Sequence, residues 1–242
     1  MKRIIALALV LLLVCGLGWI AFAEETAGDE AYNPEQIADT LRSLGIQISD
    51  EIFAETKARM EQYQAYSQQF DLIVTMPAQV FAVNLLIAVG QGVYDYETYA
   101  WTPTSSDVYA FDTEVFDIGN MYRLFLQGVQ SIVPGFSCED VQETLTEGWS
   151  IKNLLIGGGL RAEGVKTVSF QLNGKTYQKD LNYYHDWFDT AAVRWINDVL
   201  AAESFPGRLY MFDDGYQEII LIYGDQQRAN ALADLLGGFS QW

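Results

Sequence analysis

Apolar and polar residues alternate with a period of two over residues 168–181, which predicts a β-hairpin. The alternation is interrupted by Asn173-Gly174, the dipeptide most typical of a two-residue hairpin turn. Residues that are paired across such a turn share a face of the hairpin, so we expect Tyr177 to lie opposite Phe170.

A second hairpin is predicted over residues 208–223, with its turn at Asp214-Gly215. Its outgoing strand alternates, but residues 219–222 read Ile-Ile-Leu-Ile and are apolar at every position. A strand that is apolar on both faces is typical of a sheet that is covered on both faces. We therefore expect residues 219–222 to form a central strand.

Helical periodicity follows each of the two hairpins. Asp189 is a suitable cap for a helix whose apolar residues have helical spacing, namely Ala192, Ile196, Val199 and Leu200. Asp225 likewise caps a last helix, which Gly237 ends. The C-terminal part of the chain is therefore predicted to be a hairpin-helix-hairpin-helix unit.

Three helices are predicted before the first strand, over residues 34–44, 50–70 and 78–89, with Ser49 or Asp50 as the cap of the second. The third is apolar nearly all round and too short to span a bilayer, which indicates a buried core helix. We expect the three helices to form one layer against the sheet.

The middle of the chain contains both the two-residue period of strands and the 3.6-residue period of helices. Residues 92–101 alternate, residues 103–107 form a turn cluster, and residues 108–116 predict a strand. Residues 118–132 predict a helix that Asp117 caps. Residues 137–140, Ser-Cys-Glu-Asp, resemble a capping box, which predicts a further short helix. Its apolar residues have helical spacing: Val141, Leu145 and Trp149.

These elements predict an α+β fold in which an N-terminal helical layer packs on a largely antiparallel sheet. We expect a single domain over residues 34–242, with the helical layer in residues 34–90 and the mixed sheet and helices in residues 91–242. No linker rich in Pro, Gly or Ser divides the two parts.

The N-terminus predicts export. Lys2-Arg3 precede an apolar run that ends in Ala21-Phe22-Ala23, the pattern of a secretory signal peptide over residues 1–23, and an acidic tether follows over residues 24–33. The run is also long enough for an uncleaved membrane anchor, and Cys15 offers a weaker lipoprotein interpretation. We expect cleavage after residue 23, no membrane insertion of the mature chain, and a secreted or cell-envelope-exposed protein.

The net charge and the residue composition exclude several classes of binding partner. Removal of residues 1–23 leaves 12 basic and 32 acidic residues, a formal charge of −20 at pH 7. Such a charge opposes nucleic-acid binding and docking on anionic membranes, and it leaves cationic partners or Ca²⁺ possible.

Cys138 is then the only cysteine and His185 the only histidine of the mature chain, so neither an internal disulfide nor a cysteine-based zinc site is expected. No nucleotide-binding motif is present either, so we expect no cofactor and no metal.

The densest group of aromatic and acidic residues lies between the first hairpin and the helix that follows it. We take its members as candidate ligand-binding residues: Tyr183, Tyr184, His185, Asp186 and Trp187. Aromatic faces beside carboxylates suit sugars or cationic groups. The alternative is a strand-to-helix junction whose rings pack in the core.

A pair of carboxylates forms the second candidate. Asp112 and Glu114 lie two residues apart on a predicted strand and therefore on one face of it. Paired carboxylates catalyse glycoside hydrolysis or bind Ca²⁺. No pattern specific to a glycosidase family accompanies them, and the same spacing is expected on the solvated surface of so acidic a chain.

The third candidate consists of Cys138, His185 and Asp198. A cysteine at the start of a helix, followed along the chain by a histidine and an acid, has the order of many cysteine hydrolases and transglutaminase-like folds. Glu139 and Asp140 directly follow the thiol and should raise its pKa, which favours a structural cysteine.

The sequence therefore predicts an exported, non-catalytic binding or interaction module for a glycan, a small molecule or a protein, in an oligomeric state that stays open. A cysteine hydrolase or acyl transferase using Cys138 and His185 is the second hypothesis, and a carboxylate glycosidase is the third. Exposure separates the hypotheses, because a module should expose its aromatic residues, whereas an enzyme should bring Cys138 within hydrogen-bond reach of His185.

Signal cleavage can be tested on protein isolated from its native host. We expect intact-mass spectrometry to find a mature chain of 219 residues that begins at Glu24, because the small residues at positions 21 and 23 suit a signal peptidase. A membrane-embedded chain that retains Met1 would contradict cleavage and support the anchor.

Overall fold

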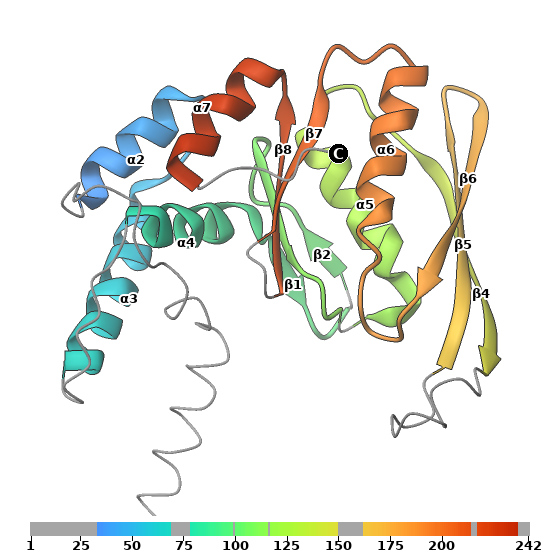
Figure 1. Cartoon of the computed structure of the whole chain (residues 1–242), viewed down its shortest axis with the longest axis horizontal. Helices are drawn as coiled ribbons and strands as arrows, with labels where there is room; N and C mark the ends of the chain where they lie inside the picture. Colours follow the sequence, from blue (N-terminus) through green and yellow to red (C-terminus); the bar gives the residue numbers. More distant parts are fainter. Residues whose placement is uncertain are drawn as a thin grey trace, which may run out of the picture.

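The computed structural model shows an α+β protein with two three-stranded antiparallel sheets and one two-stranded sheet among its described residues (Figure 1). The structure describes residues 33–68, 78–98, 100–115, 117–149, 162–213 and 217–236. The predicted signal segment, the Asp214-Gly215 turn and Gly237 lie outside these residues. The predicted fold class is confirmed, including the hairpin-helix-hairpin-helix order of the C-terminal part.

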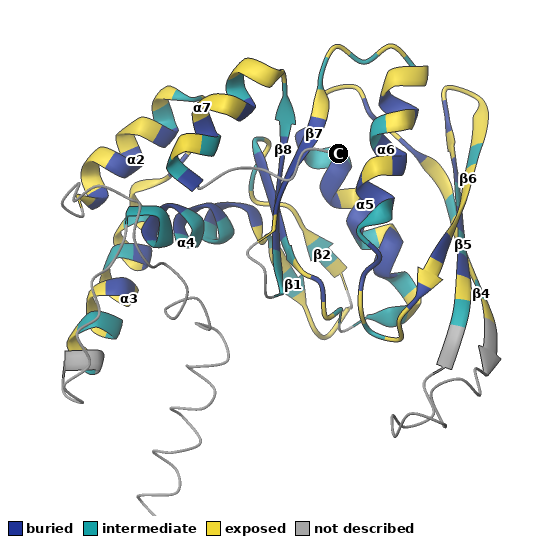
Figure 2. Ribbon diagram, viewed as in Figure 1, coloured by how far each residue is buried: buried dark blue, intermediate teal, exposed yellow. Residues whose placement is uncertain are grey.

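The central sheet has the strand order β3 (Val108–Asp112), β8 (Glu218–Gly224), β7 (Arg208–Asp213). Both pairings are antiparallel. Residues 219–222 of β8 are each at most 1% exposed, and β8 is buried along most of its length (Figure 2). The prediction of a central strand that is covered on both faces is confirmed.

One face of the central sheet packs against an outer layer of helices, namely α2 (Pro34–Ser43), α3 (Asp50–Gln68), α4 (Ala78–Gly90) and α7 (Gln226–Leu236). Alternate strand residues supply the sheet side of this core: Val108, Ala110, Tyr210, Phe212, Ile220 and Ile222. The predicted N-terminal helical layer is therefore present, and the C-terminal helix α7 completes it (Figure 1).

The opposite face of the central sheet packs against α5 (Met121–Ile132) and α6 (Ala191–Ala202). A second sheet covers the far side of these two helices, with the order β4 (Glu139–Trp149), β5 (Ala162–Leu172), β6 (Lys175–Tyr183). The described chain thus has four layers, in the order helices, sheet, helices, sheet (Figure 1).

A small hairpin of β1 (Val93–Asp95) and β2 (Ala100–Thr102) extends from the central sheet. Trp101 holds it in place, because the indole Nε1 donates to the backbone oxygen of Gln91 at 2.9 Å. The same indole packs edge-on against Tyr109 of β3, with 5.3 Å between ring centroids. The alternating pattern predicted for this part of the chain is confirmed.

The predicted first hairpin is also confirmed. Asn173 and Gly174 have φ angles of 52° and 75°, the left-handed conformation that a two-residue hairpin turn requires. Phe170 pairs with Tyr177 as expected. Their ring centroids lie 5.8 Å apart.

The tip of this hairpin is fixed to the C-terminal end of α6 through Glu203. The carboxylate accepts hydrogen bonds from Asn173 Nδ2 at 2.8 Å, from Lys175 Nζ at 2.7 Å and from the Tyr177 hydroxyl. These three donors lower the pKa of Glu203 from 4.5 to about 2. Because the pKa falls on folding, the contact stabilises the folded state above pH 4.5, and the stabilisation is lost as the pH falls towards 2.

One predicted helix is wrong, since residues 139–149 form the edge strand β4. The spacing of four between its apolar residues fits a helix, but four is also a multiple of two, and so it equally fits a strand. Thr144 and Thr146 are β-branched and favour the strand.

The backbone at the start of β4 explains why no helix begins there. Asp140 has a φ of 52°, which a right-handed helix does not allow. The register with β5 shifts between Glu139 and Gln142, as in a β-bulge. Cys138 therefore precedes a strand and not a helix, which corrects the position predicted for it.

The predicted helix caps have mixed outcomes. Ser49 and Asp225 cap α3 and α7 as predicted, through side-chain oxygens that accept backbone N–H groups. Thr190 occupies the cap position of α6, but the Asp189 carboxylate accepts the N–H of the first helical residue at 3.0 Å. Asp117 instead precedes a 3-10 turn, η2 (Ile118–Asn120), and makes no side-chain cap bond.

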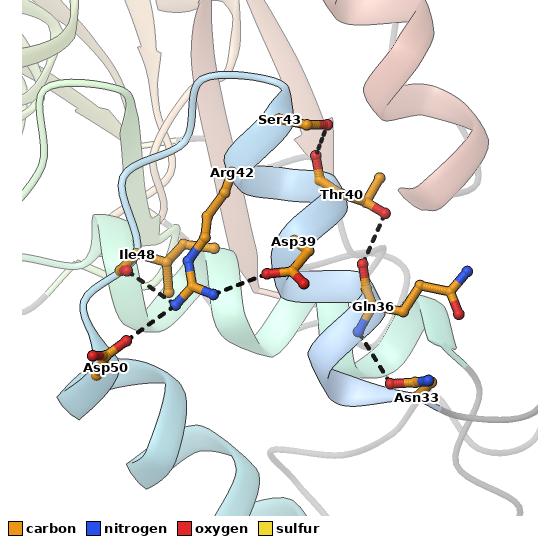
Figure 3. Close-up of polar contacts among 8 residues, drawn as sticks. All are labelled: Asn33, Gln36, Asp39, Thr40, Arg42, Ser43, Ile48 and Asp50. Atoms are coloured by element: carbon orange, nitrogen blue, oxygen red, sulfur yellow. Dashed lines mark hydrogen bonds and ion pairs between the residues drawn. The ribbon is translucent and has the colours of Figure 1, made fainter.

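Arg42 connects α2 to the start of α3 (Figure 3). Its guanidinium donates to Asp39 Oδ1 at 3.2 Å within α2, and to the backbone oxygen of Ile48 at 3.3 Å beyond the helix. It also reaches Asp50 Oδ1 at 3.5 Å. These contacts join the end of α2 to the start of α3.

A buried ion pair connects the second sheet to α5. Lys166 Nζ of β5 lies 2.7 Å from Glu143 Oε2 of β4, and the two side chains are 5% and 4% exposed. Glu143 Oε1 accepts the N–H of Arg123 in the first turn of α5 at 2.8 Å. Lys166 also donates to the backbone oxygen of Ile118 and lies 5.6 Å from the Tyr122 ring centroid.

We expect Lys166→Met to lower the free energy of unfolding by about 3–5 kcal/mol, because it leaves a buried carboxylate without its cation. The measurement is urea denaturation, with the exposed Lys179→Met of β6 as control, expected within about 0.5 kcal/mol of wild type. A double variant with Glu143→Gln keeps an acceptor for Arg123 and should be more stable than Lys166→Met alone. Equal stability of Lys166→Met and the control would contradict a structural role for the pair.

Candidate functional site

The strongest candidate site lies where the chain crosses from the second sheet to the central one. The crossing residues 184–188, here called the bridge segment, are hydrogen-bonded to the end of β3. Val115 N donates to Asp186 O at 2.6 Å, and Phe188 N donates to Thr113 O at 2.8 Å. Thr113 N in turn donates to Gln217 O at 2.7 Å, which extends the pairing towards β8.

A tight turn opens the bridge segment. Tyr184 and Trp187 pair with each other across His185 and Asp186, and Trp187 N donates to Tyr184 O at 3.4 Å. His185 has a φ of 66°, a left-handed conformation that is uncommon for residues other than glycine. The turn therefore presents Tyr184 and Trp187 as direct neighbours.

Three side chains form a row on one face of this junction. Trp187 pairs with Tyr184 on one side and with Glu114 on the other, in antiparallel bridges. Directly opposite residues in antiparallel pairs point to the same face, with roughly 5 Å between their Cβ atoms. Tyr184 is 55% exposed, Trp187 is 40% exposed, and Glu114 is exposed as well. We call Tyr184, Trp187 and Glu114 the surface row.

Phe188 anchors the row in the core. Its side chain is 5% exposed, and its ring centroid lies 5.0 Å from that of Phe111, 5.1 Å from that of Tyr122 and 4.9 Å from that of Phe125. Successive residues of an extended chain point to opposite sides, so Trp187 points to solvent where Phe188 points inward.

A polar contact fixes the end of the crossing. Asp189 Oδ2 accepts from the backbone N and from the side-chain Nδ2 of Asn182, at 2.8 and 3.0 Å. The N–H of Asp189 donates to the Tyr122 hydroxyl at 3.2 Å. The crossing is therefore held by the core and by both sheets, so that its outward side chains are presented on a fixed backbone.

The five candidate ligand-binding residues divide by exposure. Tyr184, His185, Asp186 and Trp187 reach the surface, whereas Tyr183 is buried at 9% exposure. The Tyr183 and His185 rings lie 6.2 Å apart. His185 Nδ1 lies 3.5 Å from Asp186 Oδ1, and their side chains are 65% and 37% exposed.

The structure brings Glu114 into the same site, although the sequence placed it in a separate carboxylate pair. Its Oε2 accepts from Gln217 Nε2 at 2.5 Å. Asp112 has a local function, because its Oδ1 accepts the backbone N–H of Glu114 at 2.7 Å. Sequence reasoning did not identify Gln217, which carries no local signal and reaches Glu114 only through the pairing of β3 with β8.

The structure does not bring Cys138 and His185 together. Glu139, next to Cys138, is level with Gln171 at one end of the second sheet, whereas His185 follows the other end of β6. A nine-residue strand spans roughly 26 Å, so the two residues lie at opposite ends of the sheet. Asp198 is exposed on α6.

The surroundings of Cys138 are those of a structural residue. Its side chain belongs to the core between the sheets at 8% exposure, and its backbone N donates to Gln130 Oε1 at 3.0 Å. Burial raises the pKa of the Cys138 thiol to about 11.

Neither a metal site nor a membrane-spanning helix is found among the described residues. They contain no group of three or more His, Cys, Asp or Glu side chains that could hold a metal ion. Within the same residues, no helix has both the length and the apolar character needed to cross a bilayer.

We expect Cys138 of the native protein to react slowly with iodoacetamide at neutral pH, because the reactive thiolate forms only towards pH 11. The measurement is the alkylation rate from pH 6 to pH 10, followed by mass spectrometry, with urea-unfolded protein as the fast control. His185→Ala should leave this profile unchanged. Rapid alkylation near pH 6 that disappears in the variant would instead reveal a thiolate activated by the imidazole.

Comparison with models of protein families, with curated proteins and with solved structures finds no match for this chain. Its function is therefore inferred from the surface row and its setting.

Proposed function

We propose that the protein is an exported, non-catalytic binding module whose ligand contacts the surface row and the adjoining His185 and Asp186. The observation that carries the proposal is the alignment of Tyr184, Trp187 and Glu114 by two backbone bridges on one exposed face. Large aromatic side chains normally bury most of their surface, and so two exposed neighbours are typical of a contact surface.

The rigidity of the site also supports binding. Trp187 and Tyr184 have few rotatable bonds, and the backbone between them is fixed by pairing on both sides. A surface that is already ordered loses little conformational entropy when a ligand docks, and more of the contact energy then appears as affinity. The left-handed His185 fits the same interpretation, since strained conformations gather at functional sites.

Two observations disfavour the enzymatic alternatives. A cysteine hydrolase needs a thiolate within reach of a base, whereas the Cys138 thiol is buried and lies far along the sheet from His185. A glycosidase needs two carboxylates that face the same sugar, whereas the Asp112 carboxylate accepts the backbone N–H of Glu114.

The expected location follows from the N-terminus and the charge. The positive start, the apolar run and the small residues at positions 21 and 23 support export. The formal charge of −18 for the whole chain suits a soluble surface and repels nucleic acid and anionic lipid. We therefore propose a secreted or envelope-exposed protein that meets its ligand outside the cytoplasm.

We expect Trp187→Ala to abolish ligand binding while it lowers the free energy of unfolding by only about 1 kcal/mol, because the indole is half exposed. The neighbouring Phe188→Ala should cost about 3–5 kcal/mol, since it empties a core position. Binding is measured on glycan and peptide arrays, and stability by urea denaturation.

The exposed Tyr96→Ala, outside the row, is the matched control and should bind as wild type does. If Trp187→Ala retains every array signal, or is as unstable as Phe188→Ala, the row is not a binding surface.

A further inference from the structure

We infer that the ligand of the surface row is a basic peptide segment of a protein partner, recognised through an arginine or lysine side chain that lies between the aromatic rings and Glu114. This inference rests on the proposed function and names the ligand class of the same site.

The Glu114 carboxylate has no cationic side chain beside it within the described part of the chain. The hydrogen bond that it accepts comes from the neutral amide of Gln217, which orients the group without compensating it. No basic side chain forms an ion pair with Glu114 among the residues that the structure describes. Asp186 adds a second acid beside Trp187, and its ionic neighbour is His185, which is charged only when protonated.

The two rings supply the other half of a cation site. An ammonium or guanidinium is attracted to the face of an aromatic ring, and tryptophan is the strongest such partner. Because Trp187 is paired directly with both Tyr184 and Glu114, one cation can contact a ring and the carboxylate at the same time. A guanidinium suits this arrangement best, since its plane stacks on a ring while its N–H groups donate to a carboxylate.

The exposure of the aromatic side chains in the surface row indicates the size of the ligand. Small-molecule sites are concave and enclose most of their ligand, whereas Tyr184 and Trp187 remain 55% and 40% exposed. An open row fits a partner that brings its own surface, such as an extended peptide. The formal charge of −20 of the mature chain also attracts a basic partner from a distance and gives no such advantage to a neutral sugar.

The test uses an acetylated and amidated peptide of three Gly-Ser-Arg repeats, and the same peptide with citrulline in place of arginine. Citrulline keeps the shape of arginine and removes its charge. Binding to the full mature chain is measured by fluorescence anisotropy of a labelled peptide at low and at physiological salt. Choline and a neutral oligosaccharide mixture are tested as competitors, to separate a free small cation and a glycan from the peptide.

We expect the arginine peptide to bind at least about tenfold more tightly than the citrulline peptide. Glu114→Gln, which keeps an oxygen towards Gln217, and Trp187→Ala should each weaken binding by about tenfold or more. Trp187→Phe keeps a ring and should bind with intermediate affinity. Glu139→Gln removes an exposed acid at the far end of the second sheet and should bind as wild type does.

Other outcomes overturn the inference in distinguishable ways. Equal binding of both peptides, or displacement by the oligosaccharides, with a loss in Trp187→Ala, would reject a cationic peptide but leave the row as a binding surface. Displacement by choline at concentrations similar to those of the peptide would make a small cation the ligand. If Glu139→Gln weakens binding as much as Glu114→Gln does, the peptide is attracted by the net negative charge of the protein and does not bind at the surface row. If no probe binds in a way that depends on Trp187, both the ligand class and the proposed function fail.

Discussion

The layered structure depends on a central sheet whose three strands are apolar on both of their faces. Residues 219–222 of β8 alternate between two cores, with Ile219 and Leu221 facing α5 and α6 and the other two residues facing the outer helices. β3 and β7 alternate between the two cores in the same way. A sheet with a single apolar face could bury that face only, as the second sheet does, whose outer face is solvated. The order of the four layers depends on this burial of both faces of the central sheet.

The local signals in the sequence predicted most of the fold, because hairpins and helix caps are decided within a few residues. Asn173-Gly174 is an example, since its turn requires only that both residues adopt positive φ. The failure at β4 has an equally physical reason. A spacing of four residues fits both regular structures, and the choice was made by pairing with β5, which lies far along the chain.

The candidate site was only half predictable for the same reason. The sequence identified the aromatic residues as a cluster, yet it could not tell that Trp187 would point outward and Tyr183 inward. It also had no means of joining Glu114 to Trp187, because these residues meet only when the bridge segment pairs with the end of β3. A contact between distant segments depends on the register of a whole sheet, which no short motif encodes.

The bulge at the start of β4 has a consequence for the protein in a concentrated solution. β4 is an outermost strand, and an unpaired edge is a template on which a second chain can build a continuous sheet. The left-handed Asp140 and the shifted register twist this edge out of line at one end, and a charge stands beside the irregularity. The irregularity that prevents a helix from starting at Asp140 thus also hinders the pairing of a second chain along this end of the sheet edge.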